Sequence, residues 1–287
     1  MFRITAKRVM KRSFSFQRAL YTTGALVFLL LFLLPSFFAA PLSFAAAPII
    51  RESNGSTLGS INWSGYAVNG SIGSITLATA SWTVPAVTCP SSGTTYSSFW
   101  VGIDGFQSTT VEQTGTDSDC HNGVASYYAW YEFYPKLSKS IGTITVSPGD
   151  EIGALVSYSS STGLFTVAIK DFTTGQGFKT SSAVSGAQRS SAEFIVEAPE
   201  VCTLRGCSLA ALSDFGTAGF GVGNTGIGLS CGLIMNGTKG SIGSFPVANV
   251  WPIDMVSQTN PSVIKSQPSA LTNSGSSFTV SWESAGP

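Results

Sequence analysis

The sequence contains few of the side chains that bind metals or carry charge. Its 287 residues include 15 bases, 15 acids and a single histidine, His121. One histidine excludes a His-x-x-x-His zinc site, and no Cys-x-x-Cys pair is present. The chain also has no Gly-x-Ser-x-Gly segment and no cofactor fingerprint. We therefore expect neither a metal nor a cofactor.

The charges are unevenly distributed along the chain. Residues 1–47 contain six bases and no acid, so residues 48–287 contain nine bases and all 15 acids. A sparsely charged, net acidic chain lacks the Lys/Arg footprint that a phosphate backbone requires, which excludes a nucleic-acid binder. Low net charge with many aromatic residues also argues against disorder.

The N-terminal segment has the pattern of a secretory signal. Basic residues up to Arg18 precede the mostly apolar run Ala19–Leu34, and small residues follow through Ala47. We predict a signal peptide over residues 1–47, cleaved after Ala40 or Ala47, and a secreted protein that is then free of the membrane. An uncleaved membrane anchor is the alternative, because about 20 apolar residues suffice to span a bilayer.

Five cysteines follow the predicted signal, and an exported protein meets conditions that permit disulfides. Cys202 and Cys207 are the favoured pair because only four residues separate them. The odd count leaves at least one thiol free or bridged to another chain. A catalytic pair of Cys120 and His121, in what reads as a turn, is disfavoured because neighbouring side chains of an extended chain point apart.

Short strand-like runs alternate with turn signals after the signal segment, and no helical period is sustained. This spacing predicts an all-β sandwich or barrel, forming a single domain over residues 61–287. Residues 48–60 are rich in Ser and Gly, and we expect a short pro-segment or flexible lead-in there. The predicted strands include Ser81–Val84, Ser97–Ile103, Ala125–Tyr134, Thr143–Val146, Phe165–Asp171, Ala192–Glu197 and Phe278–Trp282.

Several of these strands combine an apolar face with a face that carries Trp, carboxyl or amide groups, because successive side chains point to opposite faces. Such a face suits a substrate groove; an ordinary solvated face is the alternative. With other chemistries excluded, carboxyl acid–base catalysis assisted by an amide remains. Residues that share a face are Trp100 with Asp104, Trp130 with Glu132, Glu193 with Glu197, and Gln113 with Val111 and Gly115.

Six short blocks follow one another between about residues 62 and 215. They are Asn62-Trp63-Ser64-Gly65-Tyr66, Trp100-Val101-Gly102-Ile103-Asp104-Gly105, Gln113-Thr114-Gly115, Ala129-Trp130-Tyr131-Glu132-Phe133-Tyr134-Pro135, Thr173-Thr174-Gly175-Gln176 and Ala192-Glu193-Phe194-Ile195-Val196-Glu197. In this order they resemble the glutamic peptidase family, the eqolisins, formerly classed as A4 acid peptidases. The resemblance implies two antiparallel sheets in a lectin-like, concanavalin A-like jelly roll. It also implies a pepstatin-insensitive endopeptidase that hydrolyses polypeptides in acid, and we expect a monomer.

The resemblance also implies roles for particular residues. The catalytic amide would be Gln113, and the catalytic carboxyl would be Glu197, the second glutamate of the last block. Glu197 would take a proton from the attacking water and return it to the leaving amine, while Gln113 would orient the water and stabilise the oxyanion, a contribution of about 3–4 kcal/mol. The residues at positions that line the cleft or support this pair are Trp100, Asp104, Trp130 and Glu132.

Two points limit the resemblance. Tyr128 stands where the better-known fungal members have an acid, so the hydrogen-bond network beneath the groove is expected to differ, and residues 216–287 match poorly. A rival interpretation is a lectin-like glycoside hydrolase or carbohydrate-binding module. Glycosidases need two carboxyls about 5–9.5 Å apart. Glu193 and Glu197 are too distant within one strand, roughly 13 Å, but a partner for Glu197 on another strand stays open.

Overall fold

The computed structural model describes residues 50–52, 57–203 and 206–286. The predicted signal peptide and both of its cleavage sites lie outside these ranges, so the boundaries of the leader stay predictions. Within these ranges, no helix has the length and apolar character needed to cross a membrane.

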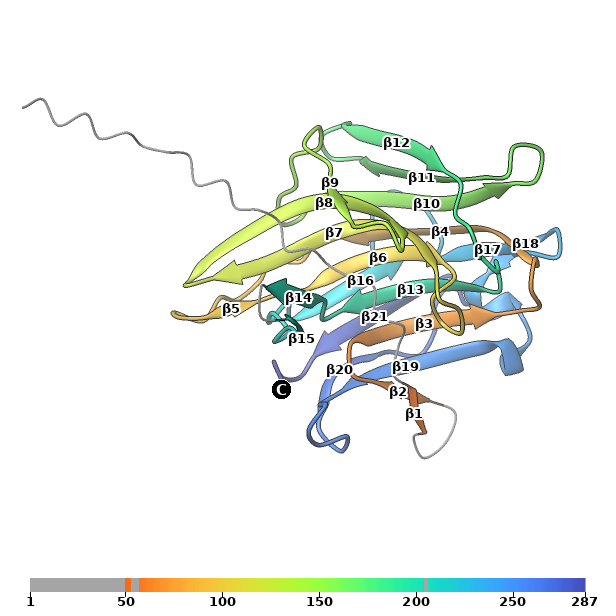
Figure 1. The fold of residues 1–287 in the computed structure, drawn as a ribbon. Coiled ribbons are helices and arrows are strands. Elements are labelled where there is room, and N and C mark those ends of the chain that lie inside the picture. Colours follow the sequence, from red (N-terminus) through yellow and green to blue (C-terminus); the bar gives the residue numbers. More distant parts are fainter. Residues whose placement is uncertain (1–49, 53–56, 204–205, 287) are drawn as a thin grey trace, which may run out of the picture. The chain divides into compact units, whose positions relative to one another are not determined.

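The described chain consists of β-strands, turns and two single-turn 3-10 helices (Figure 1). It contains no α-helix in these ranges, and the predicted all-β class is confirmed. The elements are β1 (Ile50–Glu52), β2 (Leu58–Ser60), β3 (Trp63–Asn69), β4 (Ile75–Thr83), β5 (Thr94–Thr95), β6 (Ser98–Ile103), β7 (Val111–His121), β8 (Val124–Tyr134), β9 (Lys139–Ser140), β10 (Glu151–Ser159), β11 (Leu164–Asp171), β12 (Gly177–Ser182), β13 (Ser191–Glu197), β14 (Glu200–Thr203), β15 (Gly206–Leu209), β16 (Thr217–Gly221), β17 (Gly232–Met235), β18 (Thr238–Ser241), η1 (Ile242–Ser244), η2 (Val247–Asn249), β19 (Val250–Val256), β20 (Ile264–Pro268) and β21 (Ser277–Trp282).

The strands form two antiparallel runs. The first sheet has the order β9-β8-β7-β6-β13-β3-β19. The second sheet has the order β12-β11-β10-β4-β17-β18. Strands β16, β21 and β20 link β4 of the second sheet to β19 of the first. Because β13 lies between β6 and β3, the strand that carries the last sequence block is central in its sheet.

The main hydrophobic core contains inward side chains from both sheets. Phe99 and Val101 of β6 and Phe194 of β13 pack in the same cluster as Trp82 of β4 and Val156 of β10. All five side chains are essentially inaccessible to solvent, and burial of each contributes roughly 1.5–3 kcal/mol. The alternation expected for β6 and β13 is confirmed, so their even-numbered and odd-numbered residues face different environments.

One predicted strand is wrong. Residues 143–146 form no strand, although Ile144 and Val146 are buried and give the segment its alternating pattern. The backbone N–H of Thr145 donates to the side-chain Oε1 of Gln176 at 2.7 Å instead of to a neighbouring strand. The alternation of apolar residues in this segment therefore reflects the burial of two side chains and not pairing with another strand.

Two local expectations are also corrected. Cys120 and His121 belong to the end of β7, not to a turn; the turn follows at Asn122 and Gly123, which have positive φ angles of 48° and 85°. The lead-in predicted as flexible contains β2, whose Leu58 pairs in parallel with Ile253 of β19. Residues 58–60 are therefore held by a sheet edge that local composition does not reveal.

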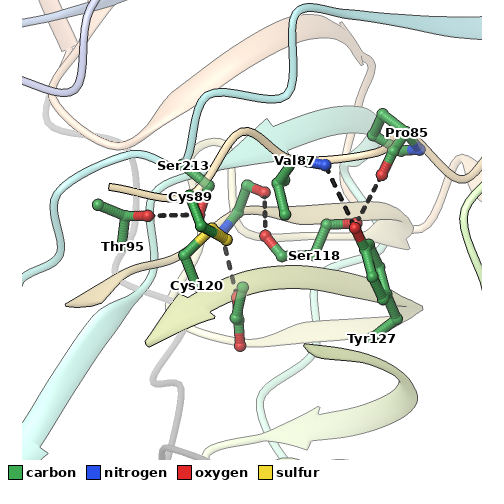
Figure 2. Close-up of a disulfide and its surroundings, with 10 residues drawn as sticks. Pro85, Val87, Cys89, Thr95, Ser118, Cys120, Tyr127 and Ser213 are labelled. Atoms are coloured by element: carbon green, nitrogen blue, oxygen red, sulfur yellow. Dashed lines mark hydrogen bonds between the residues drawn. A yellow bond between two sulfur atoms is a disulfide. The ribbon is translucent and has the colours of Figure 1, made fainter. Parts of the chain in front are cut away.

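The structure contains two disulfides. The predicted bond between Cys202 and Cys207 is present and joins β14 to β15. A second bond, between Cys89 and Cys120, ties the segment before β5 to the end of β7 (Figure 2). Cys231 is buried with a free thiol, in line with the odd count.

Candidate active site

The outer face of the first sheet carries a second cluster of apolar and aromatic side chains, separate from the main core. Two of its indoles, Trp63 and Trp100, meet edge to face with ring centroids 5.0 Å apart. The buried members are Trp63, Ala67, Trp100, Phe106, Val111, Trp130, Ile195 and Ile253. Polar groups of the same strands lie among these rings, as the alternation predicted.

Gln113 lies directly opposite Glu132 on β8 and Gly102 on β6. Its Nε2 donates to Glu132 Oε2 at 2.7 Å. Its Oε1 is buried and accepts no hydrogen bond from any described residue. A Cβ atom at Gly102 would stand 2.9 Å from the Trp100 ring and 3.3 Å from Gln113 Cβ, so glycine at this position leaves the space that the glutamine occupies.

Glu197 ends β13 and lies opposite Ser98 on β6 and Trp63 on β3. Trp100 Nε1 donates to its Oε2 at 2.8 Å, and Asn62 Nδ2 donates to its Oε1 at 3.3 Å. Burial raises the pKa of this carboxyl well above its usual range, although the indoles of Trp100 and Trp63 act in the opposite direction.

Glu132 connects the two predicted catalytic groups. It holds the Gln113 amide through a hydrogen bond, and its charge is one of the factors that raise the pKa of Glu197. Burial raises the pKa of Glu132 itself to about 8, against the lowering effect of the Gln113 bond. In acid Glu132 is therefore protonated, and it orients the amide as a neutral carboxyl group.

The expected departure at Tyr128 has a structural counterpart. Tyr128 donates its hydroxyl hydrogen to Asp117 Oδ2 at 2.6 Å, and Ser98 donates to Asp117 Oδ1 at 2.6 Å. Burial raises the pKa of Asp117 to about 6, while the Ser98, Tyr128 and Trp130 side chains lower it. The tyrosine thus supplies a hydrogen bond to a buried aspartate that is electrostatically coupled to Glu197.

Asp104 is hydrogen-bonded to the segment that precedes β13. Its carboxylate accepts hydrogen bonds from the backbone N–H groups of Gln188, Arg189 and Ser190 at 2.7–2.9 Å. It therefore braces the segment that enters β13. Burial, with a smaller contribution from the charge of Asp104, raises the pKa values of Glu112 and Glu193, two carboxyls whose oxygens accept no hydrogen bond of standard geometry among the described residues.

Three neighbours of the predicted pair were not identified as site residues from the sequence. Asn62 stands in the first sequence block, but its side chain reaches Glu197 only because β3 and β13 are paired. Asp117 is four residues after Gln113 and so shares its strand face, a signal that was available. Ser98 carried no distinguishing pattern.

This arrangement has definite chemical capacities. A carboxyl group held by two N–H donors and an amide with an unpaired carbonyl oxygen share one sheet face, so a water between them could be deprotonated and a developing oxyanion stabilised. Among the residues that the structure describes, no group of three or more His, Cys, Asp or Glu side chains could hold a metal ion.

The family model and the curated proteins that match this chain agree with one another. The model of the peptidase A4 family matches residues 61–260. Aspergillopepsin-2 from Aspergillus niger is 37% identical over 184 residues, covering 56% of this chain and 62% of the relative. Scytalidopepsin B from Scytalidium lignicola is 36% identical over 165 residues, covering 55% of this chain and 60% of the relative. The chain thus aligns with about three fifths of the length of these curated relatives.

Solved structures agree with the sequence relatives. A crystal structure of scytalido-glutamic peptidase with a transition state analog inhibitor superposes with a TM-score of 0.62 at 27% identity, covering 77% of this chain and 98% of the other. Aspergilloglutamic peptidase from Aspergillus niger gives a TM-score of 0.53 at 29% identity, covering 66% of this chain and 99% of the other. The family match spans well over half of the chain, and the fold agrees with it. The chain therefore belongs to the peptidase A4 family, the glutamic peptidases or eqolisins.

Proposed function

We propose that this protein is a secreted endopeptidase that hydrolyses polypeptides in acid, with Glu197 and Gln113 as its catalytic residues. The observation that carries the proposal is their placement on one sheet face, where Glu132 accepts a hydrogen bond from Gln113 and lies near enough to Glu197 for its charge, when it is ionised, to raise the pKa of that carboxyl. Family membership supports the same activity. Two disulfides support export, because such bonds persist in oxidising compartments.

In the proposed reaction, Glu197 removes a proton from a water that attacks the scissile carbonyl, and it does so in its ionised form, which is the minority form in acid because burial raises its pKa. The Trp100 and Asn62 donors favour the ionised form needed for this step. The elevated pKa that burial gives Glu197 then suits the second step, in which the carboxylic acid returns its proton to the leaving amine.

The Gln113 amide has the groups that the other half of the reaction requires. A primary amide has two N–H bonds and an acceptor oxygen. One N–H bonds to Glu132, which leaves the second for the tetrahedral oxyanion and leaves the unpaired Oε1 to accept a hydrogen from the attacking water. A donor of this kind contributes about 3–4 kcal/mol to the transition state.

Relatives support a peptide as the substrate. One solved structure of scytalido-glutamic peptidase contains a peptide-based transition state analog, and another, described as SCP-B of the eqolisin family, contains the tripeptide Ala-Ile-His. The aromatic rings of Trp130, Tyr128 and Tyr134 on the same face of this chain provide contact area for the side chains of an extended peptide.

The test is hydrolysis of a denatured protein in acid, with and without pepstatin. We expect pepstatin-resistant proteolysis that Glu197→Gln abolishes and Gln113→Ala reduces by about 100- to 1,000-fold. Glu283→Gln, at an exposed acid near the C-terminal end, is the matched control and retains full activity. Full activity of the Glu197→Gln protein would refute the assignment, and release of sugar from a β-glucan without peptide cleavage would favour a glycosidase.

A further inference from the structure

A polar pocket lies beside the Glu197 end of the proposed active site. Its volume is about 320 Å³, and it is lined by the two residues before β3, the β14–β15 hairpin and the loop after β19. Figure 1 shows this hairpin immediately after β13, the strand that Glu197 ends. The lining residues that matter here are Ile61, Asn62, Glu200, Ser208, Leu209 and Gln258.

One side chain belongs to both the pocket and the site. Asn62 lines the pocket, and its Nδ2 donates to Glu197 Oε1 at 3.3 Å. The backbone of the same residue accepts a hydrogen bond from the N–H of Ala198 at 2.8 Å. The pocket therefore begins one side chain away from the carboxyl that would activate the water. A peptide cleaved there would place in this pocket a side chain that flanks the scissile bond.

The pocket wall is firmly built. Glu200 pairs with Leu209 across the hairpin. Two residues farther along the same strand, Cys202 pairs with Cys207, and these two residues form a disulfide. The N–H of Ala210 closes the base of the hairpin through a hydrogen bond to the Pro199 carbonyl at 2.9 Å. A wall fixed in this way presents its polar groups without the entropic cost of ordering a loop on binding.

The polar groups of the pocket favour a cation. Glu200 supplies a carboxylate, Gln258 an amide oxygen and Ser208 a hydroxyl, and among the described residues no Lys or Arg lines the pocket. No described residue forms a hydrogen bond or ion pair with the Glu200 side chain. Ile61 and Leu209 add apolar surface. A lysine or arginine side chain combines an aliphatic stem with a positively charged end, and it matches both features.

We propose that this pocket is a subsite for a lysine or arginine side chain of the polypeptide substrate, next to the bond that is cleaved. The inference rests on the proposed peptidase function and adds a preference to it. The rest of the face is dominated by indole and phenol rings, which accept apolar side chains, so Glu200 distinguishes this subsite from its neighbours.

The test compares kcat/KM for peptides that differ at one position only. For each position around one cleavage site, a pair of peptides is made, one with lysine at that position and one with its neutral analogue norleucine. The assays are run at pH 5. For the wild type we expect lysine to be favoured about tenfold at one position flanking the cleaved bond, the size of a charge-assisted contact at a partly exposed site.

Variants of Glu200 identify the source of this preference. Glu200→Gln should reduce the lysine-to-norleucine ratio to near one, and Glu200→Lys should make glutamate the favoured residue at that position. Glu283→Gln, the matched control, should keep the wild-type ratio. A wild type without a lysine preference, or a ratio unchanged in Glu200→Gln, would overturn the subsite while leaving the peptidase assignment intact. A wild type that cleaves none of the peptides in acid would overturn both.

Discussion

Glu112 provides a direct test of how burial sets the pH dependence of stability in this protein. The side chain lies on β7 with no accessible surface, and neither carboxyl oxygen accepts a hydrogen bond from a described residue. Burial is the main cause that raises its pKa, from 4.5 to about 9, and the charge of Asp104 adds to the rise. We predict that Glu112→Gln stabilises the protein at neutral pH and leaves it unchanged in acid.

The sign and size follow from proton binding. Between pH 4.5 and about 9 the folded protein keeps the proton on Glu112 while the unfolded chain releases it. The contribution of Glu112 to stability is therefore complete below the unfolded pKa and is lost as the pH rises through the folded pKa, at about 1.4 kcal/mol per pH unit. At pH 7 the loss amounts to about 3 kcal/mol. Glutamine, which does not ionise, avoids it.

The assay is thermal unfolding of wild type and Glu112→Gln at pH 4, 7 and 9. We expect equal melting temperatures at pH 4 and a variant that is higher by roughly 6–12 °C at pH 7, because 1 kcal/mol shifts a domain of this size by about 2–4 °C. Glu132 and Glu193 also have raised pKa values, so both proteins lose stability toward alkaline pH and only their difference reports on Glu112. Equal losses at pH 7 would refute the reasoning, and the exposed control Glu283→Gln should follow the wild type.

Three further changes test other contacts. Trp100→Phe removes the N–H that lowers the pKa of Glu197, so the acid limb of the kcat/KM profile should move to higher pH; an unmoved limb would contradict this. Replacing both Cys89 and Cys120 by alanine opens a loop with a sequence separation of 31 and should cost about 3–4 kcal/mol in urea unfolding, and an unchanged free energy of unfolding would count against it. Tyr128→Phe removes the donor to the buried aspartate opposite it and should cost about 1–3 kcal/mol at pH 7. That cost should be smaller at pH 4, where this aspartate is protonated, and an equal cost at both pH values would argue against the hydrogen bond.

The alternating pattern gave reliable predictions where it arose from pairing in a sheet. Phe99 and Val101 were expected to face away from Trp100, and they lie in the main core while Trp100 lies in the cluster on the outer face. The same pattern failed at Ile144 and Val146, which are buried in an extended segment outside any sheet. Alternation reports which side chains are buried, and pairing depends on a partner strand that the local sequence does not specify.

The cysteines show a similar division. Cys202 and Cys207 are close enough in sequence for their pairing to be predicted, because a short hairpin brings them together. The partner of Cys120 could not be assigned, since Cys89 is distant in the chain and reaches it only through the pairing of β5 with β7. Figure 2 shows this region, where Val87 and Thr95 contribute hydrogen bonds beside the disulfide.

The strand class, the faces of the central strands and the family follow from the amino-acid sequence, because these depend on local alternation and on short blocks of fixed residue types. The tertiary structure alone decided which polar groups meet. It directed Asp104 to the backbone of residues 188–190, brought Asn62 to Glu197, and placed Tyr128 beside Asp117. These contacts depend on strand order and register, which are set by the packing of the two sheets and by residues far apart in the chain.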